Sequence, residues 1–142
     1  MYRFINFIIS LFIGDTSLYR LYQKALISTR KAAFYRQIAL LALETLGGFT
    51  IKTCNDGTEA IAKIENFAPQ LLLFDVMMPN MDGYGLTTAL RERGYTGKIV
   101  GLTAATIGLE TDQLITAGAD ATLSKPVDIK KLCSLVLAQE RV

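Results

Sequence analysis

The chain has 142 residues, of which 51% are hydrophobic and 20% charged, so it can form one ordinary domain with a packed core and is not expected to be disordered. It contains no histidine, which excludes histidine-based catalysis, histidine metal sites and a phosphohistidine. The net charge of +2 indicates no particular partner, but residues 1–36 carry six basic residues and one acid, so this segment differs in character from the rest.

The N-terminal stretch MYRFINFIISLFIG contains an apolar run that is too short to span a bilayer and lacks a small-residue cleavage site. We therefore expect residues 1–23 to be an atypical segment, poorly ordered or docked, and residues 24–142 to form the domain.

Cys54 and Cys133 are far apart and lack metal-ligand spacing. They are typical of reduced thiols packed in a cytoplasmic protein.

Strands and helices are expected to alternate along the rest of the chain. The candidate first strand is residues 24–29, and the run at 70–76 is continuously apolar, which is typical of a buried parallel strand. The other expected strands are 49–54, 98–104 and 121–125, and the expected helices are 36–48, 58–67, 83–93, 109–118 and 128–139. Short links between strands and helices predict a parallel sheet with helices on both faces.

Three polar residues lie at the ends of expected apolar strands: Asp75, Thr103 and Lys125. Reactive groups in such a sheet gather beyond the carboxyl ends of the strands. A carboxylate there can attack phosphorus and form an acyl phosphate, and an ammonium and a hydroxyl can bind the phosphoryl oxygens. This combination predicts transfer of a phosphoryl group.

Residues 36–142 resemble the receiver domain of two-component response regulators. The stretches that carry the resemblance are LLLFDVMMPNMDGYG, IVGLTA and AGADATLSKPVDIKKL, in this order and spacing. The resemblance implies a flavodoxin-like three-layer α/β/α sandwich with a parallel sheet in the order 2-1-3-4-5. It also implies that Asp75 is the phosphate acceptor, that Lys125 binds and senses the phosphoryl group, and that Thr103 is the switch hydroxyl. Mg²⁺ would be the cofactor, with Asp75 and the backbone carbonyl of Met77 among its ligands, and the Lys125-Pro126 bond would be cis.

The implied function is that of a receiver module in a phosphorelay. It would accept a phosphoryl group on Asp75 from a sensor histidine kinase or a phosphotransfer protein. The added charge would shift the face formed by the expected helix 109–118 and the expected strand 121–125 toward a state that binds a downstream protein. We expect no direct contact with nucleic acid or membrane, and no enzymatic activity beyond self-phosphorylation and autodephosphorylation.

The sequence departs from the receiver pattern in two places. Receivers carry two adjacent acids just after the first strand, which hold Mg²⁺, but here the corresponding positions fall near Thr29, Arg30, Lys31 and Ala32. The only upstream acid is Asp15, about fifteen residues earlier. The aromatic residue usual three positions before the lysine is replaced by Thr122. The acidic pair is therefore absent from its usual place. Either the chain loops so that Asp15 fills the site, or, as we expect, the site lacks its metal ligands, and Arg30 or Lys31 could then only partly substitute as phosphoryl binders.

Three hypotheses about the receiver remain open. The protein is a degenerate receiver that acts as a binding module without phosphorylation, or a weakly phosphorylated receiver, or a receiver whose first residues are read in a shifted frame. An enzyme that hydrolyses phosphate esters through Asp75 is a further alternative. Enzymes that resemble the haloacid dehalogenases carry a second aspartate two residues after the first, and Met77 at that position argues against this reading.

Overall fold

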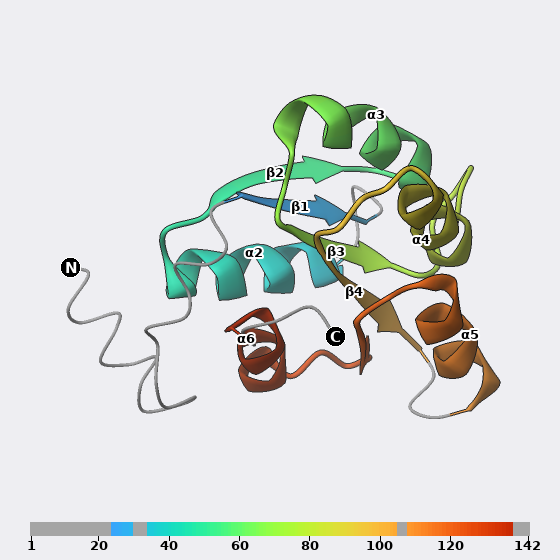
Figure 1. Cartoon of the computed structure of the whole chain (residues 1–142). Helices are drawn as coiled ribbons and strands as arrows, with labels where there is room; N and C mark the ends of the chain where they lie inside the picture. The colour runs from blue at the N-terminus through green and yellow to red at the C-terminus, as the bar shows by residue number, and fades with distance from the viewer. Residues whose placement is uncertain (1–23, 30–33, 105–107, 138–142) are drawn as a thin grey trace.

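The computed structural model describes residues 24–29, 34–104 and 108–137. Strands and helices alternate within these residues (Figure 1). The strands are β1 (Lys24–Ser28), β2 (Thr50–Cys54), β3 (Leu71–Asp75), β4 (Lys98–Thr103) and β5 (Ala121–Ser124). The helices are α2 (Phe34–Leu46), α3 (Gly57–Phe67), α4 (Gly83–Glu92), α5 (Leu109–Ala117) and α6 (Ile129–Leu137).

The five strands form one parallel sheet in the order β2-β1-β3-β4-β5. The predicted topology is therefore confirmed, including the uncertain first strand. In β1, Ala25 pairs with Ile51 on one side and with Leu71 on the other. Without β1 the edge strand β2 would have no neighbour, so this strand completes the sheet.

Helices α2 and α6 cover one face of the sheet, as Figure 1 shows. The side chains of Leu71 and Leu73 in β3 point into this layer, together with alternate residues of the neighbouring strands. The helices contribute Ala39, Ala42, Leu43, Leu46, Leu132 and Val136, all fully or almost fully buried. This layer joins the beginning of the domain to its end, because α2 follows β1 and α6 follows β5.

Helices α3, α4 and α5 cover the opposite face (Figure 1). Leu72 and Phe74 of β3 point into this second layer. They pack with Leu26, Ala60, Leu86, Leu90, Ile99 and Leu114. Because β3 is buried on both faces, its apolar run is continuous, and the aspartate that ends it stands out.

The helix starts beside the carboxyl edge of the sheet are fixed by side-chain caps. Asp56 accepts a hydrogen bond from the backbone N–H of Glu59 at 2.8 Å, which begins α3. Asp82 accepts one from Gly85 N–H at 2.9 Å, which begins α4. The expected helix 83–93 is therefore present, and Asp82 is its N-cap.

The opposite edge of the sheet, where the strands begin, is closed by charged groups. Arg91 of α4 forms an ion pair of 2.9 Å with the buried Asp120, which also accepts a hydrogen bond from the backbone of Ile99. Lys98 is buried at the start of β4 and donates to the Leu135 carbonyl of α6. Burial lowers the pKa of Lys98 below its usual value. This edge therefore ties α4, β4, β5 and α6 together.

Both cysteines are free and buried, as expected from the sequence. Burial raises the pKa of Cys54, and it raises the pKa of Cys133 to about 11. In the described part of the chain no helix has both the length and the apolar character needed to cross a membrane. The expectations about residues 1–23 lie outside the described residues.

Candidate functional site

Asp75 ends β3 at the carboxyl edge of the sheet. It is 4% exposed, and both of its carboxylate oxygens accept hydrogen bonds from Lys125 Nζ at 2.8 Å. The Lys125 side chain is also mostly covered. A buried carboxylate is costly without a partner, and a charge-assisted pair that uses both oxygens offsets that cost. The structure thus brings together the two residues that the sequence predicted to meet.

Thr103 ends β4, the neighbouring strand. Asp75 pairs with Leu102 in the sheet, so Thr103 lies one residue further along the same edge. It is 2% exposed, and its carbonyl accepts a hydrogen bond from the backbone N–H of Lys125 at 2.8 Å. β5 ends at Ser124, which pairs with Thr103. The ends of β3, β4 and β5 therefore place a carboxylate, a hydroxyl and an ammonium at one edge.

The loop after β3 wraps the carboxylate from its C-terminal side. The backbone N–H of Met77 donates to Asp75 Oδ1 at 3.2 Å, while the Met77 side chain is mostly exposed. Gly83 N–H donates to the Val76 carbonyl at 2.8 Å, which folds the loop back to α4. A Cβ at Gly83 would lie 2.4 Å from the Phe74 ring, so only glycine permits this approach.

Lys125 is held by a second contact that the sequence did not reveal. Its Nζ lies 4.5 Å from the centroid of the Tyr35 ring, a cation–π distance. Tyr35 belongs to the first turn of α2. The Lys125-Pro126 bond is cis, as the resemblance implied. Nothing in the spacing of Tyr35 marks it as a partner, because residues 35 and 125 meet only after the two ends of the domain pack together.

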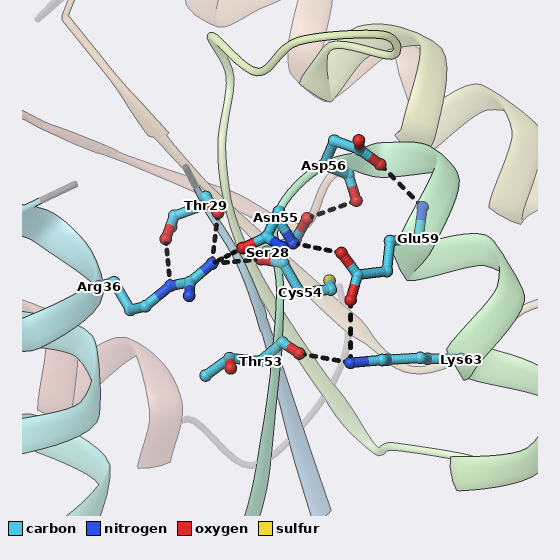
Figure 2. Close-up of polar contacts among 9 residues, drawn as sticks. All are labelled: Ser28, Thr29, Arg36, Thr53, Cys54, Asn55, Asp56, Glu59 and Lys63. Carbon is cyan, nitrogen blue, oxygen red and sulfur yellow. Dashed lines mark hydrogen bonds and ion pairs between the residues drawn. The ribbon is translucent and has the colours of Figure 1, made fainter. Parts of the chain in front are cut away.

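Arg36 organises the ends of β1 and β2, as Figure 2 shows. Its guanidinium donates to the carbonyl of Thr29 at 2.6 Å and to the hydroxyl of Thr29 at 3.0 Å. It also donates to the carbonyl of Cys54 at 2.6 Å and to Asn55 Oδ1 at 3.0 Å. All four acceptors are neutral oxygens, and no ion pair of Arg36 occurs within the described residues.

Ser28, the last residue of β1, turns toward the neighbouring loops and is fully buried. Its hydroxyl lies 3.0 Å from the carbonyl of Asp56 and 3.2 Å from the sulfur of Met78. Because Ser28 pairs with Phe74, the next residue, Thr29, stands level with Asp75 on the adjacent strand. The last residue of β1 and the residue that follows it are therefore hydroxyl residues, and both already form hydrogen bonds.

The residues that the structure describes do not fit a Mg²⁺ ion, which prefers several oxygen ligands and usually carboxylates. Within residues 24–29, 34–104 and 108–137 no group of three or more acidic, cysteine or histidine side chains could hold a metal. The sequence has no acid between Asp15 and Glu44. Arg30, Lys31 and Asp15 lie outside the described residues. That the Met77 carbonyl ligates a metal stays a prediction.

Comparisons with known proteins agree on the kind of domain. The model of the response regulator receiver domain family matches residues 32–137. The chain is 42% identical over 96 residues to the sensor histidine kinase RcsC of Salmonella typhi, a match that covers 67% of this chain and 10% of RcsC. It is 34% identical over 110 residues to the two-component response regulator ORR41 of Oryza sativa subsp. japonica, with 75% of this chain and 86% of that protein covered.

A solved structure supports the fold. The receiver domain of the sensor histidine kinase PA1611 from Pseudomonas aeruginosa PAO1, with a magnesium ion coordinated in its active site cleft, matches with a TM-score of 0.72. The match covers 82% of this chain and 96% of that domain at 24% identity, so it shows the fold alone. The chain spans about a tenth of the length of the RcsC relatives that it matches.

Proposed function

The chain belongs to the response regulator receiver family, and we propose that it accepts a phosphoryl group on Asp75 and signals through protein contacts. The observation that carries this proposal is the Asp75–Lys125 pair at the carboxyl edge of the sheet. A buried carboxylate that follows a fully apolar strand is costly, and its pairing with an ammonium beside a threonine hydroxyl suits phosphoryl transfer. The donor would be a sensor histidine kinase or a phosphotransfer protein.

In the proposed reaction, an Asp75 carboxylate oxygen attacks the phosphorus of the donor. A bond forms between that oxygen and phosphorus, and the bond from phosphorus to the donor nitrogen breaks, with the electron pair left on the imidazole. Lys125, which now contacts both carboxylate oxygens, would follow the negative charge onto the phosphoryl oxygens. The Thr103 hydroxyl, one residue along the same edge, would complete the contact.

The proposed output surface is the face formed by α5 and β5. Leu109 and Ile115 of α5 are exposed apolar side chains on this side of the domain. Movement of Lys125 and Thr103 would be passed to this face because β5 leads directly into Lys125 and β4 ends at Thr103. The partner there would be a downstream protein. The buried free thiols are consistent with a cytoplasmic place of action.

The experiment that tests the proposal is the intact mass of the protein after incubation with acetyl phosphate. We expect one phosphoryl adduct on the natural chain and none on Asp75→Asn. Asp112→Asn is the matched control, because Asp112 is an exposed residue of α5 and should keep the adduct. Since Asp75→Asn leaves Lys125 without its charged partner, its folding is checked by circular dichroism. An adduct of equal size on Asp75→Asn would contradict the proposal.

A second candidate function is favoured by the absence of the acidic pair. The protein would then be a binding module that keeps one conformation without phosphorylation. The absence of any adduct from acetyl phosphate and from a phosphorylated histidine donor would favour this alternative.

We also propose that the protein is not a phosphatase. Repeated turnover of a chromogenic phosphate ester that is lost in Asp75→Asn would contradict this proposal.

A further inference from the structure

The oxygen atoms at the carboxyl edge of β1, β2 and β3 are already held by two cationic side chains. Lys125 occupies both oxygens of Asp75. Arg36 occupies two oxygens of Thr29, the carbonyl of Cys54 and the side-chain oxygen of Asn55. These six oxygens come from the ends of three adjacent strands. A divalent cation that approached these oxygens would be repelled by two cationic side chains that already contact them.

The other acidic residues near this edge, Asp56 and Glu59, form hydrogen bonds and an ion pair with residues other than Arg36 and Lys125. Glu59 forms an ion pair of 3.1 Å with Lys63 and accepts a hydrogen bond from Asn55 N–H. Asp56 accepts hydrogen bonds from Glu59 N–H and from the side-chain amide of Asn80 at 2.7 Å. Figure 2 shows these carboxylates on the side of α3, around the end of β2. Neither contacts Arg36, so the guanidinium keeps its charge uncompensated by a carboxylate among the described residues.

We propose that Lys125 and Arg36 supply the positive charge that a divalent cation would otherwise supply at this edge, and that no Mg²⁺ therefore binds beside Asp75. The inference rests on the proposed function in one respect, namely that phosphoryl transfer to Asp75 then proceeds without the ion. Arginine and lysine are the side chains that bind phosphoryl oxygens, and both are fixed here by contacts before any donor arrives. The Arg36 guanidinium, which four oxygens hold in place, needs no reorganisation when negative charge develops.

The first test measures the binding of Mn²⁺, a substitute for Mg²⁺ whose free ion is followed by electron paramagnetic resonance. We expect the natural chain and Asp75→Asn to give the same binding curve. One additional Mn²⁺ per natural chain, displaced by Mg²⁺ and lost in Asp75→Asn, would overturn the proposal. This test does not depend on phosphorylation, so it also decides the proposal if Asp75 accepts no phosphoryl group.

The second test measures the rate of Asp75 modification by acetyl phosphate in EDTA and in Mg²⁺. In this reaction the Asp75 oxygen bonds to phosphorus, the bond from phosphorus to the acetate oxygen breaks, and acetate leaves with the electron pair. We expect rates that agree within about twofold, a difference below 1 kcal/mol in barrier. An adduct that forms only with Mg²⁺ would overturn the inference. No adduct in either buffer would overturn the proposed function, and the Mn²⁺ curve would then decide the inference.

The part assigned to Arg36 is tested by Arg36→Gln against Arg93→Gln. Arg93 lies on the surface and its ion pair with Glu65 is long, at 3.8 Å, so its loss should change neither fold nor binding. Arg36→Gln removes the cation from four oxygens, and we expect this variant to bind one Mn²⁺ with weak affinity where the natural chain binds none. A purely structural arginine would not move this affinity in the upward direction. Equal Mn²⁺ curves for the two variants would remove Arg36 from the proposal.

Discussion

Burial of the Asp75 carboxylate costs free energy, and yet this carboxylate is the group proposed to accept the phosphoryl group. Its carboxylate is buried at the end of β3, where Lys125 Nζ and the Met77 backbone N–H donate hydrogen bonds to it. Lys125 in turn sits over the Tyr35 ring. Each residue therefore depends on one from another part of the sequence. The sequence predicts that Asp75 and Lys125 meet because both lie at the ends of apolar strands. It does not predict the contact with Tyr35, because Tyr35 lies in a helix.

The carboxylates of Asp56 and Glu59 should make the stability of the domain depend on pH. Hydrogen bonds from Glu59 N–H and from Asn80 lower the pKa of Asp56 below 3.8, and the Asn55 N–H and Lys63 lower the pKa of Glu59 below 4.5. A lowered folded-state pKa stabilises the domain above the unfolded value, and this contribution is lost as pH falls through the folded value. We expect Glu59→Gln to be less stable than the natural chain at pH 7, with the difference vanishing in acid.

Urea unfolding at a series of pH values measures this difference. Glu65→Gln is the control, since Glu65 is an exposed residue of the same helix with only the long contact to Arg93. Its effect should be small and nearly constant with pH. A Glu59→Gln effect that grew as pH fell would contradict the assignment. Because the side chains of Asp56 and Glu59 are partly exposed, added salt should weaken the effect.

Helix α5 is packed on the sheet through a glycine in β4. A Cβ at Gly101 would lie 2.4 Å from the Leu114 side chain and 3.2 Å from the Phe74 ring. Gly101→Ala should therefore lower the free energy of unfolding by about 1–3 kcal/mol, the usual penalty of overpacking a core. The measurement is urea denaturation monitored by circular dichroism.

A double-mutant cycle identifies the source of that penalty. Leu114→Ala alone creates a cavity and should also destabilise, by about 2–5 kcal/mol. If the clash with Leu114 is the cause, Gly101→Ala should cost much less in the Leu114→Ala background. Strict additivity of the two changes would show that the clash is elsewhere.

The elements were predictable to different degrees. The continuous apolar run of β3 and the glycines after α2 fixed the positions of the strand and the helix end, and the structure differs from the expected bounds by one or two residues. Helix α2 begins at Phe34, whereas the expected start was Arg36. The sequence does not indicate the earlier start, because the aromatic residues at positions 34 and 35 give no clear signal for a helix start. The first strand was the weakest expectation, since its neighbours β2 and β3 are remote in sequence and only the sheet register reveals it.

The candidate site was predictable where it depends on strand ends and hidden where it depends on packing. Asp75, Thr103 and Lys125 each follow or end an apolar run, so their meeting could be inferred from topology alone. Arg36 lies inside a helical pattern and has four acceptors drawn from two strand ends and a turn. Two of those acceptors are the backbone carbonyls of Thr29 and Cys54, and a backbone carbonyl leaves no trace in the identity of the residue that carries it.

At the scale of the whole molecule, the two edges of the sheet have different roles. The edge where strands begin is closed by the Arg91–Asp120 pair and by Lys98, which bind the layers together. The edge where strands end gathers Asp75, Thr103 and Lys125 between the two helical layers. The fold thus keeps its stabilising charges away from the charges proposed to react, so that a change at Asp75 need not unfold the domain.

The proposed function requires that Asp75 itself carries the phosphoryl group. The most direct measurement is to treat the acetyl phosphate-modified protein with sodium borohydride, which reduces an acyl phosphate to the alcohol, and to map the product by peptide mass spectrometry. We predict homoserine at position 75 and unchanged aspartate at positions 56 and 82. Reduction at another carboxylate with residue 75 intact would contradict it, because the buried pair with Lys125 would then have no part in the chemistry.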